Sequence, residues 1–166
     1  MGDCNSKTAS EYKTDIESKI FPERKTETMK MNTYVNFAGN CKEALQFYEK
    51  HLGGKILMMM SFGEMPEPKK IPPGLEKSIL HARIIIGETP LMASDGPRVE
   101  PMRSAYLSLS VDSDAEAERI YKALGDGGEV FMPMAETFFA HRFGQLRDKF
   151  GINWMILHER PMPAAG

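Results

Sequence analysis

The sequence predicts an α+β fold in which the unit strand–helix–strand–strand–strand occurs twice. Segments with the composition of strands are interrupted by two amphipathic helical segments, and the order of elements is the same in each half of the 166 residues. The halves also match locally, since "FYEKHLGG" corresponds to "IYKALGDGG" and "IGETPLMASD" to "FGINWMILHE". Because an internal repeat reflects the architecture as a whole, it decides the fold class more firmly than any single element.

The composition is that of a globular protein with its own core, with 42% hydrophobic and 27% charged residues. A net charge of -2 and a pI near 6.1 provide no basic surface for nucleic acid or an anionic membrane. No apolar run reaches the length of a membrane span. With only Cys4 and Cys41, a disulfide framework is not expected, and reduced thiols in a cytoplasmic protein are the simplest reading.

Residues 1–30 are polar, charged and without periodicity, so we expect a flexible N-terminal extension outside the core. Met29 or Met31 is an alternative start of the chain. Residues 161–166 are expected to form a short tail.

The first module is expected at about residues 31–97. It begins with the strand "TYVNFAG" and a helix that Asn40 caps and Gly53 ends. The apolar stripe of this helix has helical spacing and consists of Cys41, Ala44, Leu45, Tyr48 and Leu52. Three more strands are expected: "KILMMMSF", "KSILHARIIIG" and "TPLMASD". A long Pro/Gly loop separates the first two of these three.

The second module is expected at about residues 103–160. The strand "SAYLSLSVDS" precedes a helix with Ser113 and Glu116 as a capping box. The apolar stripe of this helix consists of Ala117, Ile120, Tyr121 and Leu124. The last three strands are "EVFMPMAE", "FFAHRFGQLRDKF" and "INWMILHE".

The doubled unit is similar to the vicinal-oxygen-chelate superfamily of glyoxalase I, fosfomycin- and bleomycin-resistance proteins and extradiol dioxygenases. The strings "NFAGNCKEALQFYEKHLGG", "SFGEMP", "HARIIIGETPLMASD" and "ETFFAHRFGQLRDKFGINWMI" resemble its PhnB-like branch, which is sometimes labelled 3-demethylubiquinone methyltransferase-like. The resemblance covers residues 31–160. It implies that the two modules form a cup-shaped curved sheet with the helices outside. It also implies that the protein is a homodimer, and that any metal lies inside the cup.

The resemblance places the four metal-ligand positions of the superfamily at Thr33, Met92, Tyr106 and Ile156. None is a His or a carboxylate, which a divalent ion needs at such positions. A shift of one residue in either direction offers no better donor. We therefore expect no metal cofactor, and a divalent metal at a non-standard site stays open as the alternative.

Strand parity predicts which side chains line the cup. In "ILHARIII" one face is wholly apolar and should pack on a helix, so His81 and Arg83 on the other face should line the cup. The repeat matches His81 with Gln145 and Arg83 with Arg147. If the later strand is regular, the predicted lining is His81, Arg83, Phe139, His141, Phe143, Gln145 and Arg147. Glu136 has the opposite parity from His141 and is expected at the rim, although a bulge near residues 138–140 would change this parity.

Two guanidinium groups among aromatic side chains predict a site for a small anion. Arg83 and Arg147 would hold a carboxylate or phosphate. The other predicted ligand-binding residues are Phe139, Phe143 and Gln145, and the candidates for a catalytic role are His81, His141 and Glu136. In the alternative interpretation the two His donate hydrogen bonds within the sheet, and the two Arg pair with Asp95, Asp148 or Glu159.

The sequence therefore predicts a PhnB-like protein that binds a small, anionic molecule in the cup without the superfamily metal. The alternative is a metal-dependent glyoxalase-like lyase, isomerase or dioxygenase with a non-standard site, and whether the protein is an enzyme stays open. A methyltransferase is not expected. The sequence has no strand-bounded Gly-rich loop for a nucleotide-like cofactor, and its order of elements is not doubly wound.

Overall fold

The computed structural model describes residues 31–66, 71 and 73–161. The predicted N-terminal extension and residues 162–166 lie outside the described part. From Asn32 onward the chain forms one compact unit. None of the helices in the described ranges is long and apolar enough to cross a membrane.

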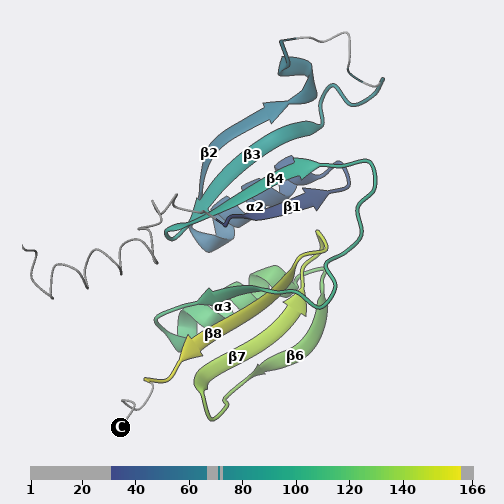
Figure 1. The fold of residues 1–166 in the computed structure, drawn as a ribbon. Coiled ribbons are helices and arrows are strands. Elements are labelled where there is room, and N and C mark those ends of the chain that lie inside the picture. Colours follow the sequence, from purple (N-terminus) through teal and green to yellow (C-terminus); the bar gives the residue numbers. More distant parts are fainter. Residues whose placement is uncertain (1–30, 67–70, 72, 162–166) are drawn as a thin grey trace, which may run out of the picture. The chain divides into compact units, whose positions relative to one another are not determined.

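The unit contains two four-stranded sheets, one per module (Figure 1). In the first sheet the strands are β1 (Thr33–Phe37), β2 (Lys55–Ser61), β3 (Ile79–Ile86) and β4 (Thr89–Asp95), in the order β1-β4-β3-β2. In the second sheet they are β5 (Leu107–Ser110), β6 (Glu129–Ala135), β7 (Ala140–Arg147) and β8 (Asn153–Glu159), in the order β5-β8-β7-β6. The first strand of each module pairs in parallel with the last, and the other pairs are antiparallel. The predicted double βαβββ order is confirmed.

Each sheet carries its helix on one face. Helix α2 (Cys41–Leu52) packs on β2, β3 and β4, and helix α3 (Asp114–Gly125) packs on β6, β7 and β8. The predicted apolar stripes point into the core: Cys41, Ala44, Leu45 and Tyr48 are buried in α2, and Ala117, Ile120 and Leu124 in α3. We call the face of each sheet away from its helix the open face.

The start of α2 differs from the expectation. Asn40 stands at the N-cap, but its side chain makes no capping bond. The Cys41 N–H donates instead to Asp95 Oδ1 at 2.9 Å, and the Ile79 N–H donates to Asp95 Oδ2 at 2.7 Å. The carboxylate at the end of β4 therefore caps the helix and anchors β3. The predicted cap at Gly53 is present, with a left-handed φ of 66. Of the predicted capping box at α3, one half is present: Ser113 Oγ accepts the Glu116 N–H at 3.2 Å, while the Glu116 carboxylate binds Arg119 instead of the Ser113 N–H.

Bulges interrupt three of the strands. β2 shifts register between Ile56 and Met58, and β6 shifts between Val130 and Met132. β7 shifts between Ala140 and Arg142. Since a bulge sets two residues against one, the alternation of faces does not continue through it. The last of these bulges changes the candidate site.

Candidate functional site

One row of paired residues crosses the open face of each sheet. In the first sheet the register pairs give Tyr34–Met92–Arg83–Met58. In the second sheet they give Ser108–Met155–Gln145–Met132. The helix-facing neighbours Val35, Ala82, Ile84, Leu91 and Ala93 are buried in the core. Both rows are therefore thioether-rich, and the first contains a guanidinium group.

Arg83 lies in the middle of the first row with unused hydrogen-bonding capacity. Its Nη2 is 4.0 Å from the Sδ of Met92, a weak acceptor. Its Nε is buried and has no hydrogen-bond partner among the described residues. A buried donor without an acceptor costs roughly 1–3 kcal/mol. Among the described residues, Arg83 is therefore a guanidinium group with hydrogen-bonding capacity that no oxygen acceptor uses.

His81 lies two residues before Arg83 on β3 and contacts Tyr34 of β1. The Nδ1 of His81 is 3.3 Å from the Tyr34 hydroxyl, and the two rings stack with centroids 5.7 Å apart. Tyr34 is 44% exposed, so this pair lies at the accessible surface of the open face. Tyr34 was not among the predicted site residues, although its alternation with Val35 and Phe37 along the strand places it on this face.

Arg147 is engaged within the protein. Its guanidinium group donates to Glu129 at 3.1 Å, to Asn153 Oδ1 at 3.0 Å and to the Met102 carbonyl at 3.2 Å. It also lies over the ring of Phe131, 5.1 Å from the centroid. Glu129 was not among the carboxylates expected to pair with it. With these contacts Arg147 ties the segment between the modules to β7, and it retains less capacity for a ligand than Arg83.

Three of the predicted ligand-binding residues lie together on the open face of the second sheet. The rings of Phe139 and Phe143 meet edge to face with centroids 5.1 Å apart. Phe143 is buried in a small cluster with Ala140 and Leu157, and Phe139 is half-exposed. Gln145 follows two residues later and pairs with Met155.

His141 does not share that face, and the prediction of its inward orientation was wrong. Its ring lies 4.9 Å from that of His158, whose Nδ1 is 2.7 Å from Asp114 Oδ1 at the start of α3. The bulge between Ala140 and Arg142 is the cause, because it reverses the parity that a regular β7 would have. The hydrogen bond from His158 lowers the pKa of Asp114 below its usual value.

Glu136 is not brought together with His141 either. Its carboxylate is exposed and forms an ion pair with Arg160. The Arg160 Nε also donates to the Thr137 carbonyl at 3.3 Å. These contacts hold the connection between β6 and β7.

The four positions matched to metal ligands do not converge on one face. Thr33 pairs with the core residue Leu91, and Ile156 is fully buried against α3, whereas Met92 lies on the open face. The open-face row contains Tyr34, Met92, Ser108 and Met155 at the corresponding strand positions. Phenol, hydroxyl and thioether groups do not fit a site for a borderline or hard divalent ion. Within the described ranges, no group of three or more His, Cys, Asp or Glu side chains is arranged to hold a metal.

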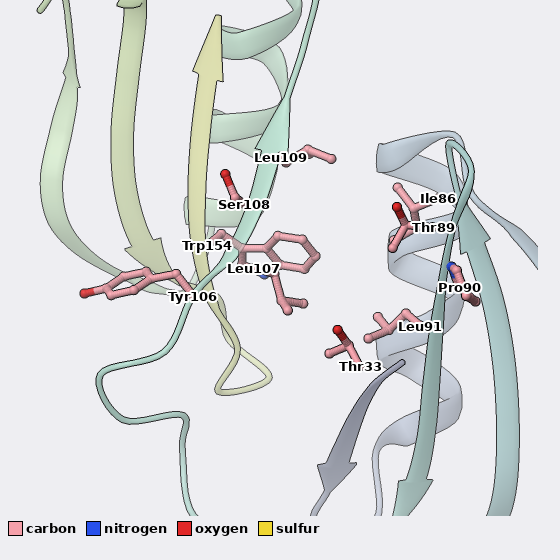
Figure 2. Close-up of a pocket in the computed structure, with 10 residues that line it drawn as sticks. All are labelled: Thr33, Ile86, Thr89, Pro90, Leu91, Tyr106, Leu107, Ser108, Leu109 and Trp154. Atoms are coloured by element: carbon pink, nitrogen blue, oxygen red, sulfur yellow. The ribbon is translucent and has the colours of Figure 1, made fainter. Parts of the chain in front are cut away.

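A pocket of about 250 Å³ lies between strand β1 with the β3–β4 turn and strand β5 (Figure 2). Thr33 and Tyr106 line it, together with Leu91, Leu107 and Trp154. Its walls are apolar with a few hydroxyl groups and carry no charged side chain. None of the candidate catalytic or ligand-binding residues lines this pocket, so it does not serve as the predicted anion site.

Comparison with known proteins identifies the family. The family model described as 3-demethylubiquinone-9 3-methyltransferase matches residues 29–157. Protein YjdN of Escherichia coli K12 is 36% identical over 138 residues, which cover 77% of this chain and 94% of YjdN. The crystal structure of protein PA1353 from Pseudomonas aeruginosa is 43% identical in sequence and superposes with a TM-score of 0.72. The match covers 80% of this chain and 98% of the PA1353 chain.

More distant structures share the fold. A putative 3-demethylubiquinone-9 3-methyltransferase, the PhnB protein of Bacillus cereus, is 22% identical with a TM-score of 0.67, over 78% of this chain and 99% of its own. The fosfomycin resistance protein FosX of Listeria monocytogenes is 12% identical with a TM-score of 0.57, over 81% and 95%. The chain belongs to the family described as 3-demethylubiquinone-9 3-methyltransferase.

Proposed function

We propose that the protein binds a small anionic molecule at Arg83 on the open face of the first sheet, without the superfamily metal. The observation that carries the proposal is the buried Nε of Arg83, which has no hydrogen-bond partner among the described residues. A carboxylate or phosphate oxygen would accept from the outer Nη groups, which the described residues leave without an oxygen acceptor, and would offset the charge of a guanidinium group whose buried Nε has no partner among those residues.

The neighbours of Arg83 favour a small, partly apolar ligand. Met92 and Met58 lie on either side of Arg83 in the row, and Met60 of β2 pairs with His81 of β3. Thioether side chains are flexible and polarisable, so they adapt to ligands of different shape. No side chain of the described residues forms an ion pair with Arg83 under 4.0 Å, so its charge is available to a ligand.

We also propose that the protein is a homodimer. Large apolar side chains remain exposed on the two modules: Tyr34, Met58, Tyr106, Phe131, Met132 and Phe139 are each between 36% and 44% exposed. Exposed apolar side chains of this size are typical of surfaces that another protein covers. A second copy over the open faces would also exclude water from Arg83 and strengthen its interaction with an anion.

A metal-dependent lyase, isomerase or dioxygenase is not favoured by any donor set on the open faces. The methyltransferase named in the family description is not carried over to this chain. Its described strands form two small mixed sheets, and the doubly wound parallel sheet that binds a nucleotide-like cofactor is not among them.

A thermal-shift screen of small anions tests the proposal. Propionate, 3-hydroxypropionate and inorganic phosphate are added separately to the wild-type protein, to Arg83→Gln and to Arg103→Gln. Arg103 is a matched control because it is exposed and, within the described part of the chain, pairs with Glu100 alone. We expect at least one anion to raise the Tm of the wild type and of Arg103→Gln, with no rise in Arg83→Gln. A rise that survives in Arg83→Gln contradicts the proposal, and so does a stoichiometric metal ion whose removal abolishes binding.

A further inference from the structure

The hydrogen bond between Tyr34 and His81 has a consequence for the ligand of the Arg83 site. The Tyr34 hydroxyl occupies the Nδ1 of His81, so Nε2 is the ring nitrogen left for another partner. If tyrosine donates, Nε2 carries the proton and is a donor. If histidine donates, Nε2 is an acceptor and the tyrosine O–H is free to donate elsewhere. In both tautomers the pair presents a neutral hydrogen-bonding group and fixes the plane of the imidazole.

This pair lies beside the guanidinium group of Arg83. His81 and Arg83 are two residues apart on one face of β3, which corresponds to about 6.6 Å between their Cα atoms. Tyr34 and Arg83 pair with Met92 from opposite sides, and the His81 ring contacts Tyr34, so the phenol–imidazole pair and the guanidinium group lie on the same open face. A ligand held by Arg83 through an anionic group therefore has a neutral polar partner only a few bonds away.

We infer that Tyr34 and His81 select a ligand that carries a hydroxyl or carbonyl oxygen a few bonds from its anionic group. This inference rests on the proposed anion site at Arg83 and adds the class of ligand, a small hydroxy or oxo acid. Tyr34 acts as a positioning residue, because it orients His81 and sets the nitrogen that meets the ligand. Arg83 would bind the anionic group of the ligand, and the Tyr34–His81 pair would bind its hydroxyl or carbonyl oxygen. The two contacts can therefore be tested separately.

The test compares two acids that differ by one hydroxyl group. Dissociation constants of propionate and 3-hydroxypropionate are measured by NMR titration for the wild type, Tyr34→Phe, Arg83→Gln and the control Tyr106→Phe. The chain has 4 His, so the imidazole signals are few enough to assign. Wild type and Tyr106→Phe should bind the hydroxy acid about fivefold more tightly, which corresponds to one net hydrogen bond. Tyr34→Phe should bind both acids equally, and Arg83→Gln should bind neither.

A second measurement separates orientation from loss of structure. The ¹⁵N signals of the His81 imidazole report its tautomer, and we expect them to change in Tyr34→Phe while those of His141 and His158 stay the same. Equal affinity of the wild type for the two acids, or a preference that persists in Tyr34→Phe, overturns the inference and leaves the anion site standing. If neither acid binds the wild type but inorganic phosphate raises its Tm, the inference is overturned and the anion site stands; if phosphate has no effect either, both are overturned.

Discussion

The hydroxyl of Tyr48 on α2 donates a hydrogen bond of 2.6 Å to Asp148 on the β7–β8 turn, so the two modules share a buried polar contact. The Asp148 carboxylate also accepts from the Trp154 indole N–H at 2.8 Å and from the backbone N–H groups of Phe150 and Ile152 at 2.9 and 3.0 Å. Tyr48 is fully buried, and Asp148 is 3% exposed. Because a buried carboxylate is costly unless its oxygens are satisfied, each of these four donors supports the junction.

Tyr48→Phe should destabilise the protein by about 1–3 kcal/mol, because it removes one donor from a buried carboxylate without opening a cavity. The free energy of unfolding is measured by urea denaturation. Tyr106→Phe is the matched control, since its hydroxyl makes no contact of this kind among the described residues, and it should lie within about 0.5 kcal/mol of the wild type. Equal stability of Tyr48→Phe and Tyr106→Phe would show that the contact is not important for the junction.

The buried thiol of Cys41 should lower the free energy of unfolding at high pH. Burial, and next the charge of Asp95, raise the pKa of its thiol from 9.0 to about 12. The folded state therefore keeps a proton that the unfolded state loses, so the stability is fully present below pH 9 and falls as the pH rises from 9 toward 12. Burial and Asp148 raise the pKa of Tyr48 in the same direction, with an onset near pH 10.

The variant Cys41→Ala separates the contribution of the thiol to the pH dependence of stability from that of other groups that titrate at high pH. Below pH 8 the variant should be less stable than the wild type by a constant amount, since a side chain in the core is shortened. Between pH 9 and 11 this difference should shrink by up to about 1.4 kcal/mol per pH unit. Urea denaturation at a series of pH values measures it. A difference that stays constant over the whole range would contradict the raised pKa.

Gly144→Ala should destabilise the second module. A Cβ at this position would lie 2.6 Å from Cε2 and 2.9 Å from Cδ2 of the Tyr121 ring, so the ring or the strand must move. Overpacking of this kind costs about 1–3 kcal/mol. Gly125→Ala is the control, because its Cβ would meet Leu146 at an ordinary 3.6 Å. In a Tyr121→Ala background the cost of Gly144→Ala should fall to that of the 3.3 Å approach to the Met134 Cα, and an undiminished cost would show that the Tyr121 ring is not responsible.

Arg83→Met should raise the stability of the protein in the absence of ligand. The substitution keeps an unbranched side chain next to Met92 and removes a buried N–H without a partner, so the free energy of unfolding should rise by roughly 1–3 kcal/mol. Arg147→Met should do the reverse, because it removes bonds to Glu129, Asn153 and Met102. Urea denaturation distinguishes the two variants. Equal losses in both would show that Arg83 has a purely structural role.

Much of the architecture follows from the sequence because two signals coincide. The apolar stripes of the helices and the repeated order of elements each predict βαβββ twice, and every predicted strand is present. Alternation also places Ala82 and Ile84 correctly in the core and Arg83 on the open face. These predictions depend on local periodicity, because the residues that pack into the core recur along the sequence at the spacing of a helix or a strand.

The predictions that failed depend on long-range or irregular geometry. The bulge in β7 turns His141 toward α3, and no composition signal fixes its position between Ala140 and Arg142. The alignment of the two repeats is off by one residue in the last strand: it matched Met92 with Ile156, which is a core residue. The residue that takes the place of Met92 on the open face of the second sheet is Met155. The cap from Asp95 replaces one from Asn40 because a strand brings the carboxylate to the helix, which local sequence does not reveal.

Calorimetric titration of small anions measures directly whether Arg83 binds them. The anion that stabilises the wild type best in the thermal-shift screen is titrated into the wild type, Arg83→Met and Arg103→Gln at low ionic strength. Loss of a charge-assisted hydrogen bond corresponds to about a tenfold or greater rise in Kd. We expect this rise in the Kd of Arg83→Met, with the Kd of Arg103→Gln within twofold of the wild-type value. A Kd for Arg83→Met within twofold of the wild-type value would contradict it.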